Sequence, residues 1–402
     1  MNLAGMVLVA ANLKMSQGQT VEPIHGVRRM AAIDILRAFA ALWVVAFHVY
    51  LYTPGIRNQA KGLLISFAQA GHVGVNLFLV LSGFCVFSGL YKNQPERNIK
   101  VDVRKFFKRR FLRIYPAYFA ALVVATASVA LLADPDILKP AIFLQKFGTH
   151  ALFIHNLFPS TILSVDGPFW SLALEVQLYV LMPLFILFVN RIGWKGLLGG
   201  TLALTAATQV LSGHFLDRDS VGIWTVWHSG VLARCFEFAC GMFACHLYYR
   251  REPVKIPILA MVSAIILVAF ARCIRDGNAS GVFVDQMFGI GFAAMILMAL
   301  RLPEKVVNAA PMRLLEGVGL ISYSLYLLHN NALNRFWLPY FGHGLSPMTQ
   351  LYVNLTIFPT LLCLVSWGFW RLFEYPALRQ SRAKAVQPVM VDGAPEGIRQ
   401  VA

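Results

Sequence analysis

Long apolar runs separated by short polar segments recur along almost the whole chain. Ten runs approach or exceed the length of about 20 residues that an α-helix needs to cross a bilayer. The approximate spans are residues 31–53, 69–90, 114–132, 169–189, 196–212, 229–249, 254–272, 282–300, 314–338 and 349–372. The fifth is short and the second contains polar residues, so nine or eleven spans also fit. The pattern predicts an all-α, polytopic membrane helix bundle with about ten transmembrane helices.

Polar segments at both ends divide the chain into three parts. Residues 1–30 are predicted to be a cytoplasmic N-terminal segment, because their short apolar run precedes the basic pair Arg28-Arg29 instead of following a basic region, unlike a secretory signal. Residues 31–376 form the expected integral-membrane domain. Residues 377–402 are polar and contain Pro and Gly, which predicts a disordered cytoplasmic tail. The apolar segment 141–158 is interrupted by charge, and it fits an interfacial or re-entrant piece better than a span.

Composition and charge support a membrane protein and exclude nucleic acid as the partner. Of the 402 residues, 58% are hydrophobic and only 13% are charged, whereas soluble domains carry about 25% charged residues. The net charge is +16, from 35 Lys and Arg against 19 Asp and Glu. With the N-terminus inside, 25 of the 35 basic residues fall on the cytoplasmic side and 7 on the outer side. This positive-inside bias predicts that both termini are cytoplasmic.

No metal site is predicted. Cys235, Cys240 and Cys245 recur every five residues, a spacing that scatters them around a helix. The chain also contains no phosphate-cradling glycine loop, no zinc-ligand spacing and no serine nucleophile elbow.

Three ionisable residues lie within the first span, where lipid makes each of them costly. Asp34, Arg37 and His48 share one stripe of the helix, with His48 roughly 16 Å beyond Arg37. The stripe therefore faces a cavity, and its two ends could contact the two ends of one long ligand. His48 is a candidate general base, because imidazole titrates near neutral pH. Alternatively, Asp34 and Arg37 form a structural pair and His48 caps the outer end.

The loop before the third span is the most basic part of the chain. Arg109, Arg110 and Arg113 lie together where that span begins, and such guanidinium clusters suit bidentate recognition of phosphate. The alternatives are a topology signal and attraction to anionic lipid headgroups.

Polar side chains also follow single faces of two later spans. Ser171, Glu175 and Tyr179 are spaced i, i+4, i+8 on the fourth span. A buried carboxylate there could orient a histidine, bind a sugar hydroxyl or bond a neighbouring helix. Tyr326 and His329 share a face of the ninth span with Ser322. A functional role and a role in helix–helix packing fit these residues equally well. Arg234 and Glu237 on the sixth span are expected to neutralise each other. His72, His155 and His246 are isolated, which favours packed or interfacial side chains.

From Ile33 to Pro376 the chain resembles the membrane acyltransferase-3 family. Six segments in order carry the resemblance. They are Ile33-Asp34-Ile35-Leu36-Arg37 followed by His48, Leu81-Ser82-Gly83-Phe84, Arg109-Arg110-Phe111-Leu112-Arg113-Ile114-Tyr115-Pro116, Gly167-Pro168-Phe169-Trp170-Ser171-Leu172 with Glu175, Ile321 to His329, and Phe373-Glu374-Tyr375-Pro376. Val176 stands where many members have a second carboxylate. Some members append an extracytoplasmic esterase-like domain, and we expect none in this sequence.

The resemblance implies a bacterial inner-membrane O-acyltransferase that moves an acyl group, usually acetyl, from acyl-CoA to a hydroxyl of a surface or secreted glycan. Acyl-CoA would be a co-substrate, with no tightly bound cofactor. On this hypothesis Arg109, Arg110 and Arg113, helped by Arg37, hold the CoA phosphates. His48 acts as general base or takes the acyl group transiently, with Glu175 orienting it or positioning the sugar. Further residues are expected to be structural or substrate-facing: Asp34, Ser82, Trp170, Ser171, Tyr326 and His329.

Two other classes of protein fit the pattern of spans. A secondary transporter of a sugar or glycan precursor also combines many spans with charges near the midplane, although this chain shows no internal repeat. A non-catalytic membrane partner of a polysaccharide synthase is the third possibility. The sequence identifies neither the acceptor hydroxyl, nor the acyl chain, nor the oligomeric state.

Overall fold

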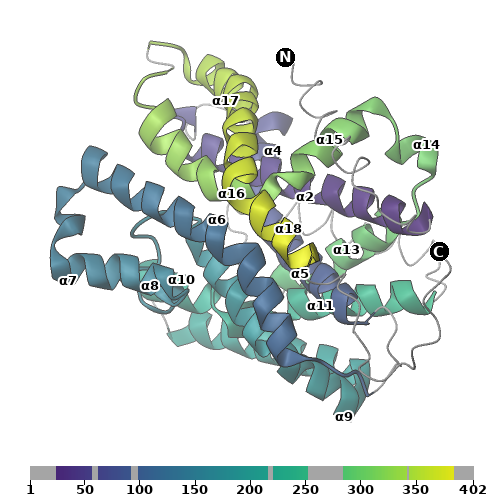
Figure 1. Ribbon diagram of the computed structural model, residues 1–402. Coiled ribbons are helices and arrows are strands. Elements are labelled where there is room, and N and C mark those ends of the chain that lie inside the picture. Colours follow the sequence, from purple (N-terminus) through teal and green to yellow (C-terminus); the bar gives the residue numbers. More distant parts are fainter. Residues whose placement is uncertain are drawn as a thin grey trace, which may run out of the picture.

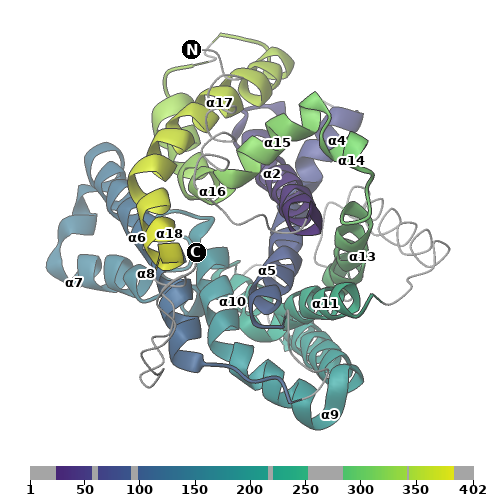
Figure 2. The same ribbon diagram turned by 45° about the vertical axis from the view of Figure 1, so that its right-hand side comes forward.

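The computed structural model describes residues 24–56, 62–91, 98–215, 221–251, 284–341 and 344–383, and the regular structure in these ranges is helical. The longer helices are α2 (Ile24–Tyr52), α5 (Gly74–Tyr91), α6 (Val103–Leu132), α9 (Phe169–Phe215), α11 (Val231–Arg250), α13 (Val284–Ala299), α15 (Ala310–Leu320), α16 (Ser322–Asn331) and α17 (Pro347–Phe369). Shorter helices are α4 (Leu63–Gln69), η1 (Ala70–Val73), η2 (Pro135–Leu138), α7 (Pro140–Phe143), η3 (Leu144–Gly148), α8 (Thr149–Ala151), η4 (His155–Leu157), α10 (Val221–His228), α14 (Glu304–Val307), η5 (Ala332–Trp337), η6 (Trp370–Glu374) and α18 (Tyr375–Ala383). Figures 1 and 2 show them gathered into one bundle. The predicted all-α class is confirmed for the described residues.

In the described part of the chain, six helical segments are long and apolar enough to cross a membrane. They are Ala31–Tyr52, Leu63–Tyr91, Val103–Leu132, Phe169–His214, Thr225–Arg250 and Pro347–Arg379. The expected count of ten is not confirmed. The eighth expected span is α13, which has 16 residues and is shorter than a bilayer crossing requires. The seventh, 254–272, lies outside the described residues.

Local backbone conformation explains two further differences from the expected spans. The fourth and fifth expected spans belong to one helix, α9, which bends at Gly193, where φ is 75°. This left-handed conformation is readily available only to glycine. The ninth expected span, 314–338, is interrupted at Ile321, which ends α15 before α16 begins. Hydrophobic periodicity does not register such a break, because apolar residues resume directly after it at Leu325, Leu327 and Leu328.

The ends of the membrane domain also differ from expectation. The tail expected to be disordered from residue 377 instead continues as helix α18 to Ala383. Residues 1–23 and 384–402 lie outside the described part of the chain. The apolar segment 141–158 consists of short helical turns between α6 and α9. In that segment the rings of His150 and His155, both fully buried, stack 3.8 Å apart.

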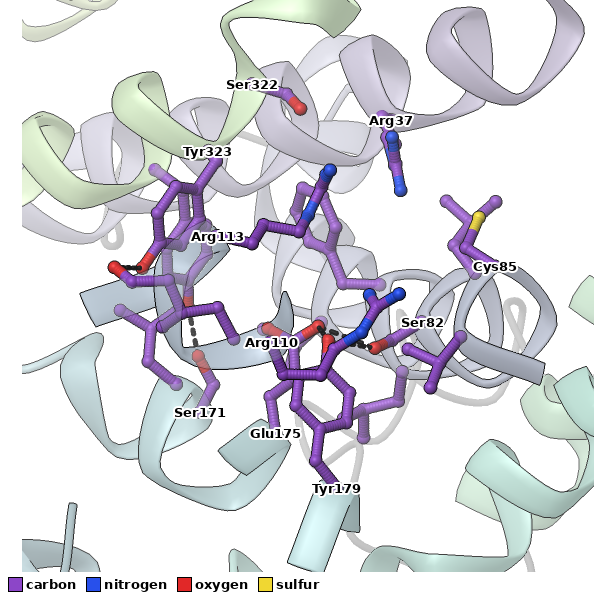
Figure 3. Close-up of a pocket in the computed structure, with 18 residues that line it drawn as sticks. Arg37, Ser82, Cys85, Arg110, Arg113, Ser171, Glu175, Tyr179, Ser322 and Tyr323 are labelled. Carbon is purple, nitrogen blue, oxygen red and sulfur yellow. Dashed lines mark hydrogen bonds between the residues drawn. The ribbon is translucent and has the colours of Figure 1, made fainter. Parts of the chain in front are cut away.

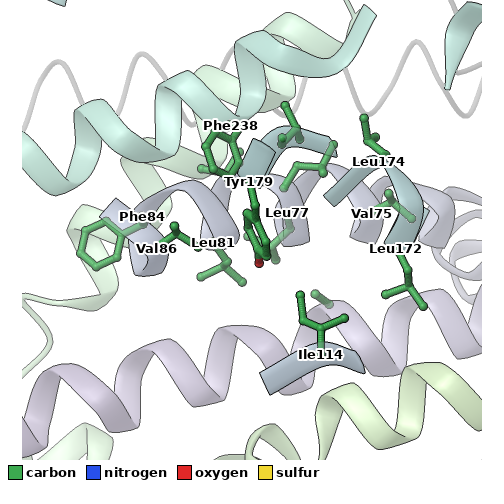
Figure 4. Packing of buried hydrophobic residues seen from close by; sticks show 14 of the residues in the cluster. Val75, Leu77, Leu81, Phe84, Val86, Ile114, Leu172, Leu174, Tyr179 and Phe238 are labelled. Carbon is green, nitrogen blue, oxygen red and sulfur yellow. The ribbon is translucent and has the colours of Figure 1, made fainter. Parts of the chain in front are cut away.

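Helix α5 lies within the bundle and packs against α11, α2 and α13. Two glycines allow α5 and α11 to approach closely. A Cβ atom at Gly83 would collide with the backbone carbonyl of Phe238, and one at Gly241 would collide with that of Val80. Small residues have this function in membrane bundles, where packing rather than exclusion from water holds helices together. Figure 4 shows the apolar side chains beside this contact, including Leu77, Leu81, Tyr179 and Phe238.

Candidate active site

Two cavities lie along the inner helices and meet at two shared lining residues, Val75 and Tyr326. We name the first, of about 90 Å³, the arginine cavity. It is lined by Arg37, Val75, Phe78, Leu79, Leu81, Ser82, Cys85, Val86, Arg110, Arg113, Ile114, Ser171, Leu172, Glu175, Tyr179, Ser322, Tyr323 and Tyr326. The second, of about 670 Å³, is the histidine cavity. Its lining includes His48, His72, Asn76, Asp166, Trp170, Arg234, Asp285, Asn330 and Arg335.

The arginine cavity brings together guanidinium groups from two helices. Arg37 comes from α2, and Arg110 and Arg113 come from the first turns of α6. Asp102 caps α6, where its side chain accepts a hydrogen bond from the backbone N–H of Lys105. Figure 3 shows the three guanidinium groups pointing toward the space between the helices.

These arginines differ in how their charge is balanced. Arg37 is 3.4 Å from the carboxylate of Asp34, which is 5% exposed. Arg110 and Arg113 have no ion pair with a described carboxylate. The guanidinium of Arg110 lies over the ring of Tyr179, 5.8 Å from its centre, and its Nε is buried without a hydrogen-bond partner. A cation with unfilled donors facing a cavity suits an anionic ligand.

Glu175 is held on the wall of the arginine cavity by two hydroxyl groups. Ser82 Oγ donates to Glu175 Oε1 at 2.6 Å, and Tyr179 OH donates to the same oxygen at 2.5 Å (Figure 3). The predicted face of α9 therefore forms, because Tyr179 follows Glu175 by one helical turn. The neighbour across the cavity, Ser82 on α5, comes from a segment 93 residues away. Glu175 does not line the histidine cavity.

Tyr326 separates the two cavities. Its hydroxyl lies 2.6 Å from Ser171 Oγ, and both hydroxyls can donate to the backbone carbonyl of Pro168. The ring of Phe78 meets the Tyr326 ring edge-on at 5.6 Å. A long ligand that reached from one cavity into the other would pass this aromatic pair and Val75.

Two histidines meet where α2 and α16 face each other. His48 Nδ1 lies 2.9 Å from the carbonyl of Val44 and 3.3 Å from His329 Nε2. His329 Nδ1 lies 2.6 Å from the carbonyl of Tyr326. Because a carbonyl can only accept, we assign a proton to Nδ1 of both rings. His329 Nε2 then accepts from His48, and His48 Nε2 carries a free lone pair.

This arrangement gives His48 the properties of a general base or nucleophile. His48 lines the histidine cavity, and two acceptors hold its ring through Nδ1. If Nε2 took up a proton, the positive charge would be stabilised by the lone pair of His329, as a buried carboxylate does in hydrolase triads. Among the described side chains, His329 lies within hydrogen-bond distance of His48, whereas Glu175 lines the arginine cavity.

Asp166 lies on the wall of the histidine cavity, before α9 begins. It is 4% exposed and accepts a 2.5 Å hydrogen bond from the side-chain amide of Asn330. Burial raises the pKa of Asp166 to about 7, even though the Asn330 bond and the charge of Arg335 favour the ionised form. Its carboxyl group can therefore change protonation near neutral pH.

The structure brings most of the predicted site residues to the two cavities. Residues at the arginine cavity are Arg37, Ser82, Arg110, Arg113, Ser171, Glu175 and Tyr326, while His48 and Trp170 line the histidine cavity. Asp34 pairs with Arg37. Arg109 is exposed on the outer side of α6 and lines neither cavity. Among residues within the described ranges, no cluster of His, Cys, Asp and Glu could hold a metal ion.

Sequence reasoning missed several residues of the histidine cavity. His72 was expected to be an isolated packed histidine, but it lines this cavity with His48. Asn76 and Asp285 also line it. A polar residue within an apolar run is the only signal that could have identified Asn76, since its partners lie 161 and 209 residues away.

Comparison with known proteins places this architecture in a family. The model of the acyltransferase domain family, Acyl_transf_3, matches residues 30–369. No solved structure matches the chain.

Curated relatives are about one quarter identical to this chain over the aligned residues. The peptidoglycan O-acetyltransferase OatA of Listeria monocytogenes is 25% identical over 327 residues, covering 74% of this chain and 48% of its own. The O-acetyltransferase OatA of Staphylococcus aureus is 24% identical over 372 residues, covering 87% and 58%. The acyltransferase MdmB of Streptomyces mycarofaciens is 25% identical over 336 residues, covering 79% and 81%. The chain thus spans about half the length of the OatA proteins. Because the family model covers most of its length, the chain belongs to the acyltransferase-3 family.

Proposed function

We propose that the protein is a membrane O-acyltransferase that moves an acyl group, acetyl first among the candidates, from acyl-CoA to a hydroxyl group of a glycan. The observation that carries this proposal is the junction of the two cavities at Val75 and Tyr326. One cavity is rich in guanidinium groups and the other presents the free imidazole nitrogen of His48. Two relatives are named O-acetyltransferases, one of them for peptidoglycan, which supports a glycan acceptor.

The donor would bind from the arginine cavity. CoA carries several phosphates, which suit Arg110 and Arg113 because neither lies within ion-pair distance of a described carboxylate. A cavity of about 90 Å³ cannot hold a whole CoA molecule. We therefore expect the nucleotide to stay at the cavity mouth while the narrow pantetheine arm enters and displaces Tyr326. The thioester would then reach the ring of His48.

The transfer would occur in one step at His48 Nε2. This nitrogen takes the proton of the acceptor hydroxyl while the oxygen attacks the thioester carbonyl. The new C–O bond forms, the C–S bond breaks, and the imidazolium returns the proton to the leaving thiolate, so CoA departs as the free thiol. A two-step route would instead transfer the acyl group first to His48 and then to the acceptor. Detection of an acyl group on His48, with an acyl donor that reacts slowly, would favour this two-step route.

The charge distribution supports an orientation for the protein. The arginine cavity would open toward the cytoplasm, where acyl-CoA is made, and the histidine cavity toward the outer face of a bacterial inner membrane. Both termini would then be cytoplasmic, as the excess of basic residues on that side indicates.

Acyl-CoA affinity tests the donor site. We expect Arg110→Ala to weaken binding of acetyl-CoA to the purified protein by roughly tenfold or more, since it removes a hydrogen-bonded charge pair. Arg104→Ala is the matched control, because Arg104 is exposed on the same helix and lines neither cavity. If the two variants bound acetyl-CoA with equal affinity, the Arg110 cluster would be a topology signal and not a donor site.

Product formation tests the chemistry and separates the enzyme from the alternatives. His48→Ala should bind acetyl-CoA like the wild type but acylate no glycan. A transporter or a non-catalytic synthase partner would consume no labelled acetyl-CoA in either form. Normal product from His48→Ala would contradict the proposed mechanism.

A further inference from the structure

An interconnected cluster of polar side chains from four helices lies at the wall of the histidine cavity, which Arg234, Asp285 and Asn76 line directly. Arg234 on α11 contacts Glu237 at 2.9 Å and Asp285 on α13 at 3.1 Å. Asn76 on α5 donates to Asp285 at 2.8 Å. Gln209 on α9 donates to the second oxygen of Asp285 at 3.2 Å. The expected pairing of Arg234 with Glu237 is confirmed, but Asp285 joins it.

The described charged side chains that line the histidine cavity balance one another, since Arg234 and Arg335 are matched by Asp166 and Asp285. Arg234 has two carboxylate partners, so its charge is already compensated. The other guanidinium group that lines this cavity, Arg335, lies close enough to Asp166 to interact with its charge. The arginine cavity differs, since three arginines, Arg37, Arg110 and Arg113, line it together with one described carboxylate, Glu175. The histidine cavity therefore favours an uncharged polar ligand.

His72 provides an unfilled hydrogen-bond acceptor on the same cavity. Its Nδ1 lies 3.0 Å from the backbone carbonyl of Gln69, so Nδ1 carries the proton and Nε2 has the lone pair. His72 Nε2 is buried and has no hydrogen-bond partner among the described residues. A buried acceptor without a donor is costly, and the hydroxyl group of a ligand would remove that cost.

The two histidines that line the cavity both pack against one aromatic ring. The Phe47 ring is 5.1 Å from His48 and 5.3 Å from His72, centre to centre, and edge-on to both. Trp170 adds a second aromatic surface to the cavity lining. Two imidazole acceptors beside an apolar ring suit a sugar, because a sugar presents hydroxyl groups next to apolar C–H groups.

We propose that this wall of the histidine cavity is the acceptor subsite, that it takes an uncharged sugar, and that His72 binds a hydroxyl other than the one acylated. The inference rests on the proposed function and adds to it the charge of the acceptor and a residue that positions it. A cavity of about 670 Å³ lies within the usual range for small-ligand sites of about 300–1,000 Å³.

Three substitutions of His72 separate binding of an acceptor from support of the fold. In His72→Gln the side-chain amide reaches about as far as Nε2, whereas in His72→Asn it reaches only as far as Nδ1. His72→Phe keeps the ring without polar atoms. Gln69→Ala is the matched control, because it keeps the backbone carbonyl that His72 bonds and its side chain lines neither cavity.

The assay measures acceptor-dependent release of CoA thiol by the full chain in lipid nanodiscs with acetyl-CoA. The probes are β-1,4-linked tetramers of glucose, N-acetylglucosamine and glucuronate. We expect the wild type to have a KM for one of the neutral tetramers at least tenfold below that for the glucuronate tetramer. His72→Phe and His72→Asn should raise the KM for the neutral tetramer by roughly tenfold, the effect of one hydrogen bond. Their KM for acetyl-CoA should stay within twofold of the wild type.

The outcomes distinguish this inference from the proposed function. If His72→Asn has the wild-type KM for the neutral tetramer and His72→Gln does not, the important bond is the one from His72 Nδ1 to the Gln69 carbonyl. His72 would then support the fold and not bind the acceptor. If glucuronate is used as well as the neutral tetramers, the charge argument is wrong while acyl transfer stands. If no tetramer stimulates CoA release by the wild type, the proposed glycan acyltransferase itself is contradicted.

Discussion

The contact between His48 and His329 leads to a prediction that can be quantified. His329→Phe keeps a buried aromatic ring but removes the Nε2 atom that lies 3.3 Å from His48 Nδ1. The carbonyl of Val44, at 2.9 Å from the same nitrogen, remains. The variant therefore keeps the reactive tautomer of His48 and loses only the partner that stabilises its positive charge during transfer.

The expected loss follows from the strength of that one hydrogen bond. A hydrogen bond to a charged group contributes about 1.5–3 kcal/mol. Because each 1.36 kcal/mol changes a rate tenfold, His329→Phe should lower kcat by roughly 10- to 160-fold. His48→Ala should abolish transfer, because the proposed mechanism assigns to His48 alone the removal of the proton from the acceptor hydroxyl.

Steady-state release of CoA thiol, with acetyl-CoA and glycan varied in turn, measures the effect. We expect kcat to fall while the KM for acetyl-CoA stays within twofold, because His329 lines neither cavity. His155→Phe is the control, since it also replaces a fully buried histidine by phenylalanine away from both cavities. A loss of less than threefold, or the same loss in His155→Phe, would refute the proposal that His329 stabilises the positive charge of His48.

Three further predictions concern stability, measured by thermal unfolding in detergent. Gly83→Ala should destabilise the protein by more than the roughly 1–3 kcal/mol typical of overpacking, because the new Cβ would meet backbone rather than a flexible side chain; an unchanged Tm would show that α5 and α11 can separate freely. Ser82→Ala removes a hydrogen bond to the carboxylate of Glu175 and should cost about 1.5–3 kcal/mol, against about 0.5–1.5 kcal/mol for Ser88→Ala, which loses a neutral bond; equal losses would contradict a charged Glu175. Asp166→Asn should gain in Tm relative to the wild type as pH rises from about 4 to 7, since the raised pKa of Asp166 makes the folded wild type hold a proton that the unfolded chain releases; a constant difference would show that Asp166 does not titrate in this range.

The amino-acid sequence was sufficient to identify side chains that share one helix face. Arg37 and His48 on α2 do reach two different cavities, and Arg110 and Arg113 on α6 do face the first. These positions follow from helical periodicity and from the cost of placing charge in lipid. The same reasoning grouped Arg109 with its neighbours, although it is exposed, because adjacent residues on a helix point in different directions.

Only the tertiary structure decided which helix faces meet. His48 contacts His329 across 281 residues of sequence, and Asn76 reaches Asp285 across 209. The break at Ile321 likewise precedes α16, which contributes Tyr326 and Asn330 to the histidine cavity. Periodicity could not reveal these contacts, because in a membrane both the lipid-facing and the packed surfaces of a helix are apolar. The pairing of faces depends instead on close packing and on polar bonds between distant segments, and this pairing separates the arginine cavity from the histidine cavity.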